Sequence, residues 1–151
     1  MIDGVKIKKL VKHADDRGFF MEVLRDDDNI LKKFGQYSIS LSYPGVIKAF
    51  HYHKIQDDIW FFPVGNAQVV LYDLRNGSKT EGETDVFYMG ENNLIYLYIP
   101  AGVAHGYRVL GNSPAVITYI TTESYKPAHL DEYRISWDDP KIGFNWHTAN
   151  E

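Results

Sequence analysis

The sequence has no cysteine, which excludes disulfide frameworks, thiol nucleophiles and thiolate metal sites. It also has no excess of basic residues, since 16 Lys and Arg stand against 20 Asp and Glu and give a net charge of −4. No hydrophobic run approaches the roughly 18 residues of a membrane span, and residues 1–15 lack the apolar block of a signal peptide. We therefore expect a cytoplasmic protein that binds neither nucleic acid nor a membrane.

Length and composition indicate one β-rich domain, which we assign to residues 1–151. Aromatic residues make up 15% of the chain, and 12 Gly and 6 Pro separate short apolar runs. Strands are expected at 19–24, 36–42, 46–53, 58–62, 67–73, 86–88, 94–99 and 115–122. The acidic segment 25–29 can cap one short helix over 30–34 that ends at Gly35. About eight to ten short strands joined by turns favour a sandwich or a jelly roll.

Histidines provide the first candidate site. His51 and His53 lie two residues apart in an expected strand, so their side chains share one face while Tyr52 points to the other. A third histidine, His105, follows the turn at 100–102 and begins the next strand. The alternative is a surface strand whose two histidines are simply solvated. The three together favour a cavity lined by imidazoles.

The spacing of these residues resembles the two cupin motifs. Gly45, His51, His53, Asp58 and Gly65 follow the spacing of the first motif, with Asp in place of the usual Glu. The segment 100–105 resembles the core of the second. The resemblance implies an all-β fold, a cupin-type antiparallel β jelly roll (double-stranded β-helix) that encloses a cavity.

A more extended resemblance runs from Asp16 to Trp146. The blocks at 16–22, 45–52, 72–75, 98–107, 119–127 and 137–146 closely resemble those of the dTDP-4-dehydrorhamnose 3,5-epimerases, in the same order. The resemblance implies a homodimer that needs no cofactor and no metal. Its substrate would be a nucleotide-linked 4-keto-6-deoxy sugar, used in the synthesis of surface-polysaccharide precursors.

The residue roles that the resemblance implies fit the chemistry of a 4-keto sugar. A ketone acidifies the protons on both neighbouring carbons, so epimerisation needs a base on one face, an acid on the other and a group that holds the enolate oxygen. His51 matches the family's base and Tyr119 its acid, and Asp139 is the candidate carboxylate that orients His51. The positions that match the family's substrate-binding residues are Arg17, Phe20, Glu22, Gln36, Lys48, His105 and Tyr125.

Two departures from the family pattern keep other functions open. Asp58 stands where these epimerases carry a lysine that stabilises the enolate, and a carboxylate would destabilise it. Lys48 replaces an arginine, which loses bidentate phosphate geometry. One alternative is a metal-binding cupin, an isomerase or dioxygenase with His51, His53, Asp58 and His105 as ligands. Another is a non-catalytic protein that binds a sugar nucleotide or a carbohydrate.

Overall fold

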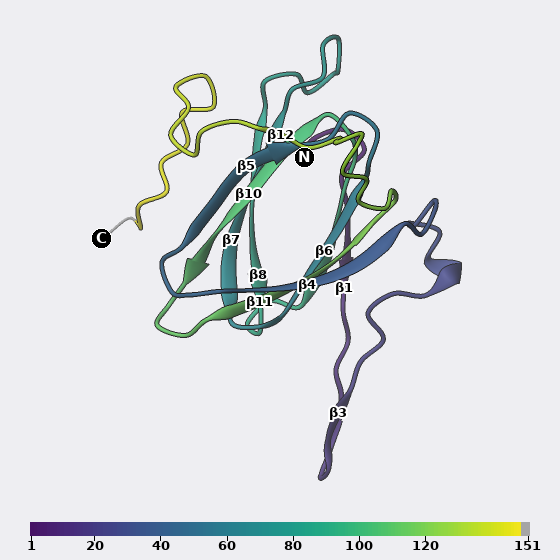
Figure 1. Cartoon of the computed structure of the whole chain (residues 1–151). Coiled ribbons are helices and arrows are strands. Elements are labelled where there is room, and N and C mark those ends of the chain that lie inside the picture. Colours follow the sequence, from purple (N-terminus) through teal and green to yellow (C-terminus); the bar gives the residue numbers. More distant parts are fainter. Residues whose placement is uncertain (149–151) are drawn as a thin grey trace.

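Two five-stranded antiparallel sheets face each other in this computed structural model, which describes residues 1–148 (Figure 1). The first sheet has the order β1 (Lys6–Lys9), β9 (Ile95–Ile99), β6 (Asp58–Val64), β11 (Ala115–Thr121) and β4 (Gln36–Ser42). The second has the order β12 (Tyr133–Arg134), β5 (Ile47–Tyr52), β10 (Val103–Leu110), β7 (Asn66–Asp73) and β8 (Thr84–Gly90). The predicted all-β jelly roll is confirmed. The single domain over 1–151 stays a prediction, and its last three residues lie outside the described ones.

The main hydrophobic core lies between the two sheets. Its buried side chains come from central strands of both, among them Trp60, Phe62, Val69, Leu71, Leu97 and Val109. These strands have few exposed residues, because both of their faces are covered. The edge strand β4 instead alternates exposed and inward residues, so only one of its faces is covered.

A hairpin of β2 (His13–Asp15) and β3 (Gly18–Phe20) forms a third, two-stranded sheet (Figure 1). It projects well away from the two large sheets. Every residue of both strands is exposed. The strand expected at 19–24 ends at Phe20, because within residues 1–148 no strand pairs with residues 21–24.

The helix expected over 30–34 is not formed. The helical element is a single 3₁₀ turn, η1 (Asp26–Asp28), and Asn29 ends it in the left-handed conformation with φ 54°. A five-residue segment gains too few hydrogen bonds to offset helix nucleation. Ile30 and Leu31 pack instead against a buried cluster around Tyr96 and Tyr98. Within residues 1–148 no helix is long and apolar enough to cross a membrane.

Candidate active site

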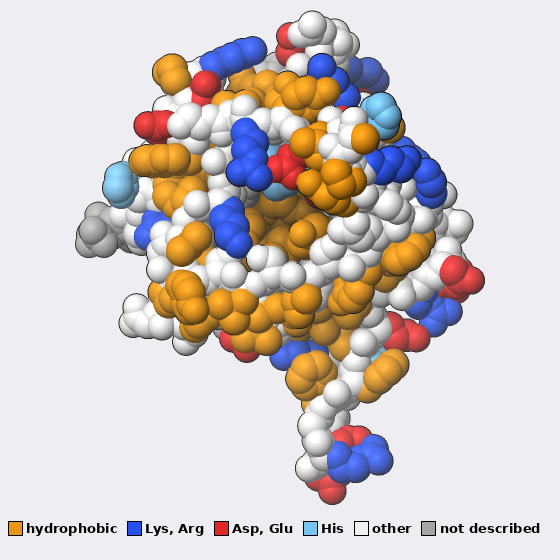
Figure 2. All heavy atoms as spheres, in the orientation of Figure 1, with side chains coloured by type: hydrophobic (Ala, Val, Ile, Leu, Met, Phe, Trp, Pro, Cys, Tyr) orange, Lys and Arg blue, Asp and Glu red, His pale blue; other side chains and the backbone are white. Residues whose placement is uncertain are grey.

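A cavity of about 830 Å³ opens on one side of the barrel. Strands β4, β5, β6 and β11 and the segment 123–135 contribute its lining. Figure 2 shows the hollow, with apolar side chains inside it and Lys and Arg side chains near its rim. The basic residues of the lining are Lys48, Lys126 and Arg134. Such a cavity is large enough for a small organic ligand. Glu123, Asp131 and Glu132 also line it, and Glu132 pairs with Arg134 at 2.8 Å.

Close approach of β5 and β10 brings two histidines together. His51 on β5 is paired in register with His105 on β10. A Cβ added to Gly106 would lie 2.3 Å from the Cβ of Ala49, so glycine is what allows the two strands to meet here. The Nε2 atoms of His51 and His105 are 2.9 Å apart as a result.

The hydrogen bonds of His105 fix the tautomers of the pair. Its Nδ1 lies 2.9 Å from the carbonyl oxygen of Val103, and because a carbonyl only accepts, Nδ1 carries the proton. In the neutral pair His105 Nε2 is then the acceptor, and His51 donates to it from Nε2. His51 consequently keeps the lone pair of Nδ1. Burial, followed by the neighbouring His105, lowers the pKa of His51 well below its ordinary range, so this imidazole is neutral at pH 7.

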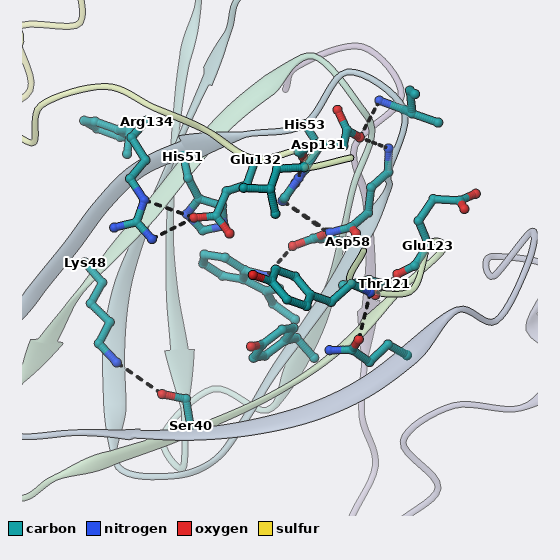
Figure 3. Close-up of a pocket in the computed structure, with 18 of the residues that line it drawn as sticks. Ser40, Lys48, His51, His53, Asp58, Thr121, Glu123, Asp131, Glu132 and Arg134 are labelled. Carbon is teal, nitrogen blue, oxygen red and sulfur yellow. Dashed lines mark hydrogen bonds and ion pairs between the residues drawn. The ribbon is translucent and has the colours of Figure 1, made fainter. Parts of the chain in front are cut away.

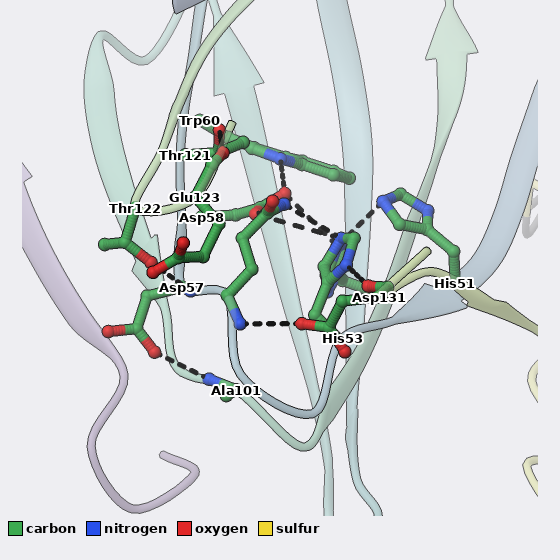
Figure 4. A network of polar contacts seen from close by, with 12 residues as sticks. His51, His53, Asp57, Asp58, Trp60, Ala101, Thr121, Thr122, Glu123 and Asp131 are labelled. Carbon is green, nitrogen blue, oxygen red and sulfur yellow. Dashed lines mark hydrogen bonds and ion pairs between the residues drawn. The ribbon is translucent and has the colours of Figure 1, made fainter. Parts of the chain in front are cut away.

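Asp58 lies behind this pair and is buried. Its carboxylate accepts hydrogen bonds from the Gln56 amide at 2.8 Å and the Trp60 indole at 3.3 Å (Figure 4). His105 Nε2 lies 3.6 Å and His53 Nε2 3.8 Å from its oxygens. Burial acts to raise the pKa of Asp58, but its interactions with His105, His53 and Gln56 outweigh burial and lower that pKa to about 2. Asp58 is therefore a buried anion.

His53 is held by a segment distant in sequence. Its Nδ1 donates to the carbonyl oxygen of Asp131, while the Asp131 carboxylate accepts the backbone N–H groups of Lys54, Ile55 and Gln56 at 2.8–2.9 Å (Figure 4). Both His51 and His53 line the cavity, as the strand alternation predicts, and Tyr52 stacks on Tyr133. Asp131 and Gln56 were not predicted from the sequence. Asp131 acts across 75–77 positions, which no local pattern marks, and Gln56 lies in the loop between β5 and β6, where strand alternation assigns no face.

Four further predicted residues line the cavity. Tyr119 is half-buried on β11, in the sheet opposite the one that carries His51. The Lys48 ammonium donates to Ser40 Oγ at 3.1 Å (Figure 3). The Gln36 side chain donates to Ser38 and accepts the backbone N–H of Tyr125, which itself is exposed at the rim. The structure thus places a phenol and an imidazole on opposite walls of one cavity.

Asp139 is not beside His51, contrary to the prediction. Its carboxylate accepts the backbone N–H groups of Lys141 and Ile142 at 2.9 and 3.4 Å, and the residue is not part of the cavity lining. An aspartate in a turn bonds its own backbone in this way because the short side chain reaches the next amides. The side chain that hydrogen-bonds the His51 ring is that of His105.

Other predicted binding residues lie outside this chain's cavity. Arg17 pairs with Asp15 on the projecting hairpin, Phe20 is 65% exposed there, and Glu22 pairs with Arg25. His105 is 2% exposed and is not among the residues that line the cavity, which it meets through its hydrogen bond to His51; its role in substrate binding stays a prediction. Arg134, on β12 opposite His51 in register, lines the cavity and was missed.

Four side chains of this site also have the donor set of a metal centre. One ligand atom from each of His51, His53, Asp58 and His105 lies within 4.8 Å of the other three. Imidazole nitrogens with one carboxylate suit a first-row transition ion better than Ca²⁺ or Mg²⁺.

Comparison with known proteins shows which family the chain belongs to. The model of the dTDP-4-dehydrorhamnose 3,5-epimerase family matches residues 1–151. The chain belongs to this family. It is 70% identical to the spore coat polysaccharide biosynthesis protein SpsL of Bacillus subtilis, over 98% of both chains. It is 36% identical to the probable low-salt glycan biosynthesis epimerase Agl13 of Haloferax volcanii, over 97% of this chain and 95% of that protein.

Solved structures of dTDP-sugar epimerases and isomerases share the fold. A dTDP sugar isomerase from Desulfovibrio desulfuricans superposes with a TM-score of 0.90 at 29% identity, covering 99% of this chain and 94% of that one. The epimerase of Legionella pneumophila, solved in complex with dTDP-4-keto-L-rhamnose, superposes with a TM-score of 0.87 at 30% identity, covering 99% and 82%. Membership of the epimerase family does not favour the two alternative functions, a metal-binding cupin isomerase or dioxygenase and a non-catalytic protein that binds a sugar nucleotide or a carbohydrate.

Proposed function

We propose that the protein epimerises a dTDP-linked 4-keto-6-deoxy sugar at carbon 3, carbon 5 or both. The observation that carries the proposal is the neutral His51 imidazole, which faces the cavity from one sheet while the Tyr119 phenol faces it from the other. His51 takes the proton from a carbon next to the ketone and leaves an enolate. Tyr119 then returns a proton from the opposite face, which inverts that centre. Protons and electrons balance without an oxidant or reductant.

His105 and the rim have supporting roles in this proposal. The hydrogen bond of 2.9 Å to His105 orients the His51 ring and holds its Nε2 proton, so that Nδ1 accepts the substrate proton. Lys48 is a cation of the lining that would meet the diphosphate, and Arg134 would join it by exchanging its bond to Glu132 for one to a phosphate oxygen. The names of SpsL and Agl13 support a role in polysaccharide or glycan biosynthesis. We place that role in the cytoplasm, where the nucleoside triphosphates for sugar activation are available.

We further propose a homodimer in which each hairpin completes the partner's cavity. Arg17 and Phe20 are expected to bind substrate, yet they lie on the projecting hairpin, away from their own cavity. The outer face of the edge strand β4 also carries an apolar row of Tyr37, Ile39 and Leu41, which are 52–71% exposed. Such an exposed row next to an unpaired strand edge is typical of an interface. The apolar band below the hollow in Figure 2 lies over β4.

The reaction is tested by incubating the protein with dTDP-4-keto-6-deoxyglucose and related nucleotide sugars and following the products by NMR. Inversion at carbon 3 or carbon 5 in at least one of them is expected. A panel without any inversion or exchange contradicts the proposed reaction.

The dimer is tested separately by complementation. His51→Asn and Arg17→Ala are each expected to be inactive, while a mixture of the two recovers activity because hybrid dimers contain one intact cavity. Ile39→Asp should shift the mass in light scattering to that of a monomer. A wild-type protein that is monomeric and active contradicts the exchange of hairpins.

A further inference from the structure

Three buried acceptor groups lie close together behind His51: the Nε2 atoms of His53 and His105 and the carboxylate of Asp58. The Nδ1 atoms of His53 and His105 both donate to backbone carbonyls, those of Asp131 and Val103, so each ring has an unprotonated Nε2, at 3.8 and 3.6 Å from the Asp58 oxygens. His53, Asp58 and His105 are 2–6% exposed. A second ring nitrogen bound to a carbonyl is the usual support of a metal-ligating histidine, because it fixes the tautomer and the orientation of the ring.

Asp58 also lacks a permanent counter-charge. Within residues 1–148 the ionisable groups inside 4 Å of its carboxylate oxygens are the imidazoles of His105 and His53, at 3.6 and 3.8 Å. No Lys or Arg side chain of these residues lies that close. Buried carboxylates are otherwise paired with a cation or bound to a metal, because an isolated buried charge is costly. Here the Gln56 amide bridges His53 Nε2 at 3.2 Å and Asp58 Oδ1 at 2.8 Å. A neutral amide donor thus lies between His53 Nε2 and the Asp58 carboxylate.

The distances between these atoms suit a small divalent ion. Ligands held 2.0–2.2 Å from Zn²⁺ are about 3–4 Å from one another. The two imidazole-to-carboxylate distances fall in this range, and His51 Nε2 completes the set at 2.9 Å from His105 Nε2 (Figure 4). No large rearrangement of the strands is needed, because all four ligand atoms already lie within 4.8 Å of one another.

We propose that His51, His53, Asp58 and His105 form a site for a divalent first-row transition ion of the Zn²⁺ type. The ion would displace the Gln56 amide and take the Nε2 lone pairs of His53 and His105, and that of His51 once the His51 Nε2 proton has been released to solvent. A consequence that rests on the proposed function is competition between ion and turnover. Once His51 is a ligand its ring can no longer accept the substrate proton, so the ion-bound protein is the inactive form.

Binding is measured by titrating tag-free, chelator-treated protein with Zn²⁺ in a calorimeter and with Co²⁺ by its visible absorption. One ion per chain with a tetrahedral Co²⁺ spectrum is expected. His53→Ala and Asp58→Asn should each weaken binding more than about 100-fold, beyond the 10–100-fold that loss of an outer-shell partner costs. His147→Ala removes an exposed histidine away from the cavity and is the matched control; it should bind like the wild type, as should Gln56→Ala.

Circular dichroism melts show whether each variant is folded. Binding that is absent in the wild type, or equal in wild type, His53→Ala and Asp58→Asn, overturns the site.

The competition is measured as the ratio of exchange rates with and without one equivalent of Zn²⁺. The wild type should lose at least about 90% of its rate when the site is filled, as expected for a blocked general base, whereas His53→Ala should show a ratio near one. Exchange activity in a protein that binds no ion overturns the metal site and leaves the epimerase intact. A protein that binds Zn²⁺ but shows no exchange even without the ion overturns the proposed reaction and leaves the metal site intact. A rate that rises with bound Zn²⁺ overturns the competition and the role of His51 as a free base.

Discussion

Asp58 and Asp73 are two buried carboxylates in the same barrel with different surroundings. Asp73 is 1% exposed, and its oxygens accept two hydrogen bonds from the Arg75 guanidinium and one each from the hydroxyls of Ser78 and Thr80 at 2.7–2.8 Å. Asp58 is 3% exposed but has only imidazoles, an amide and an indole around it. Burial alone therefore does not identify a functional acid. The difference lies in whether the charge is neutralised within the fold, as at Asp73, or left available beside a cavity.

The largest effect should come from the cavity, without loss of stability. Tyr119→Phe removes the proposed acid and is expected to slow inversion about 10²–10⁴-fold, while deuterium exchange at the same carbon continues because His51 can return the deuteron from its own side. The melting temperature should change little. The measurement is NMR of the sugar in D₂O, which reports exchange and inversion separately. Equal losses of both would place Tyr119 outside the protonation step.

The reverse pattern is expected at Asp73. Asp73→Asn should lower the free energy of unfolding by about 2–3 kcal/mol, because buried charge-assisted hydrogen bonds to Arg75 are lost. Asp58→Asn should cost about 1 kcal/mol or less, since its partners are neutral donors that an amide oxygen can still satisfy. Urea denaturation of both variants gives the two values. A larger loss for Asp58→Asn would contradict the contrast between the two carboxylates.

Acid should reveal the same contrast. Burial acts to raise the pKa of Asp73, but the hydrogen bonds from Arg75, Ser78 and Thr80 outweigh it and hold the pKa far below its ordinary range. Because the folded pKa is below the unfolded value of about 3.9, this stabilisation is complete above about pH 5 and is lost as the pH falls. The stability gap between wild type and Asp73→Asn should therefore narrow from about pH 5 to about pH 2. A constant gap would show that Asp73 is not ionised in the fold.

The smallest effect is expected at Asp139. Asp139→Ala should leave kcat/KM within about twofold of the wild type, because this carboxylate bonds its own backbone and does not contact His51. His147→Ala provides an exposed control in the same terminal segment. A loss of a hundredfold or more in Asp139→Ala alone would restore Asp139 as the residue that orients His51.

The sequence predicted strands and shared faces well where one face of a strand is buried. The strand at 36–42 has the observed bounds of β4, and two-residue alternation placed His51 and His53 in one cavity. The same reasoning failed where the partner is remote. Nothing near His53 points to the carbonyl of Asp131, and nothing near His51 shows that His105, rather than Asp139, holds its ring. The short helix failed because packing of Ile30 and Leu31 against Tyr96 and Tyr98 outweighed a weak local preference.

The most direct test of His51 as the base is the wash-in of solvent deuterium by matched wild-type and His51→Asn proteins. Both are incubated in D₂O with dTDP-4-keto-6-deoxyglucose, after binding of dTDP has been shown to be equal. We expect deuterium at carbon 3 or carbon 5 with the wild type and no enzymatic exchange with His51→Asn. Exchange by His51→Asn at the wild-type rate would show that another group removes the proton.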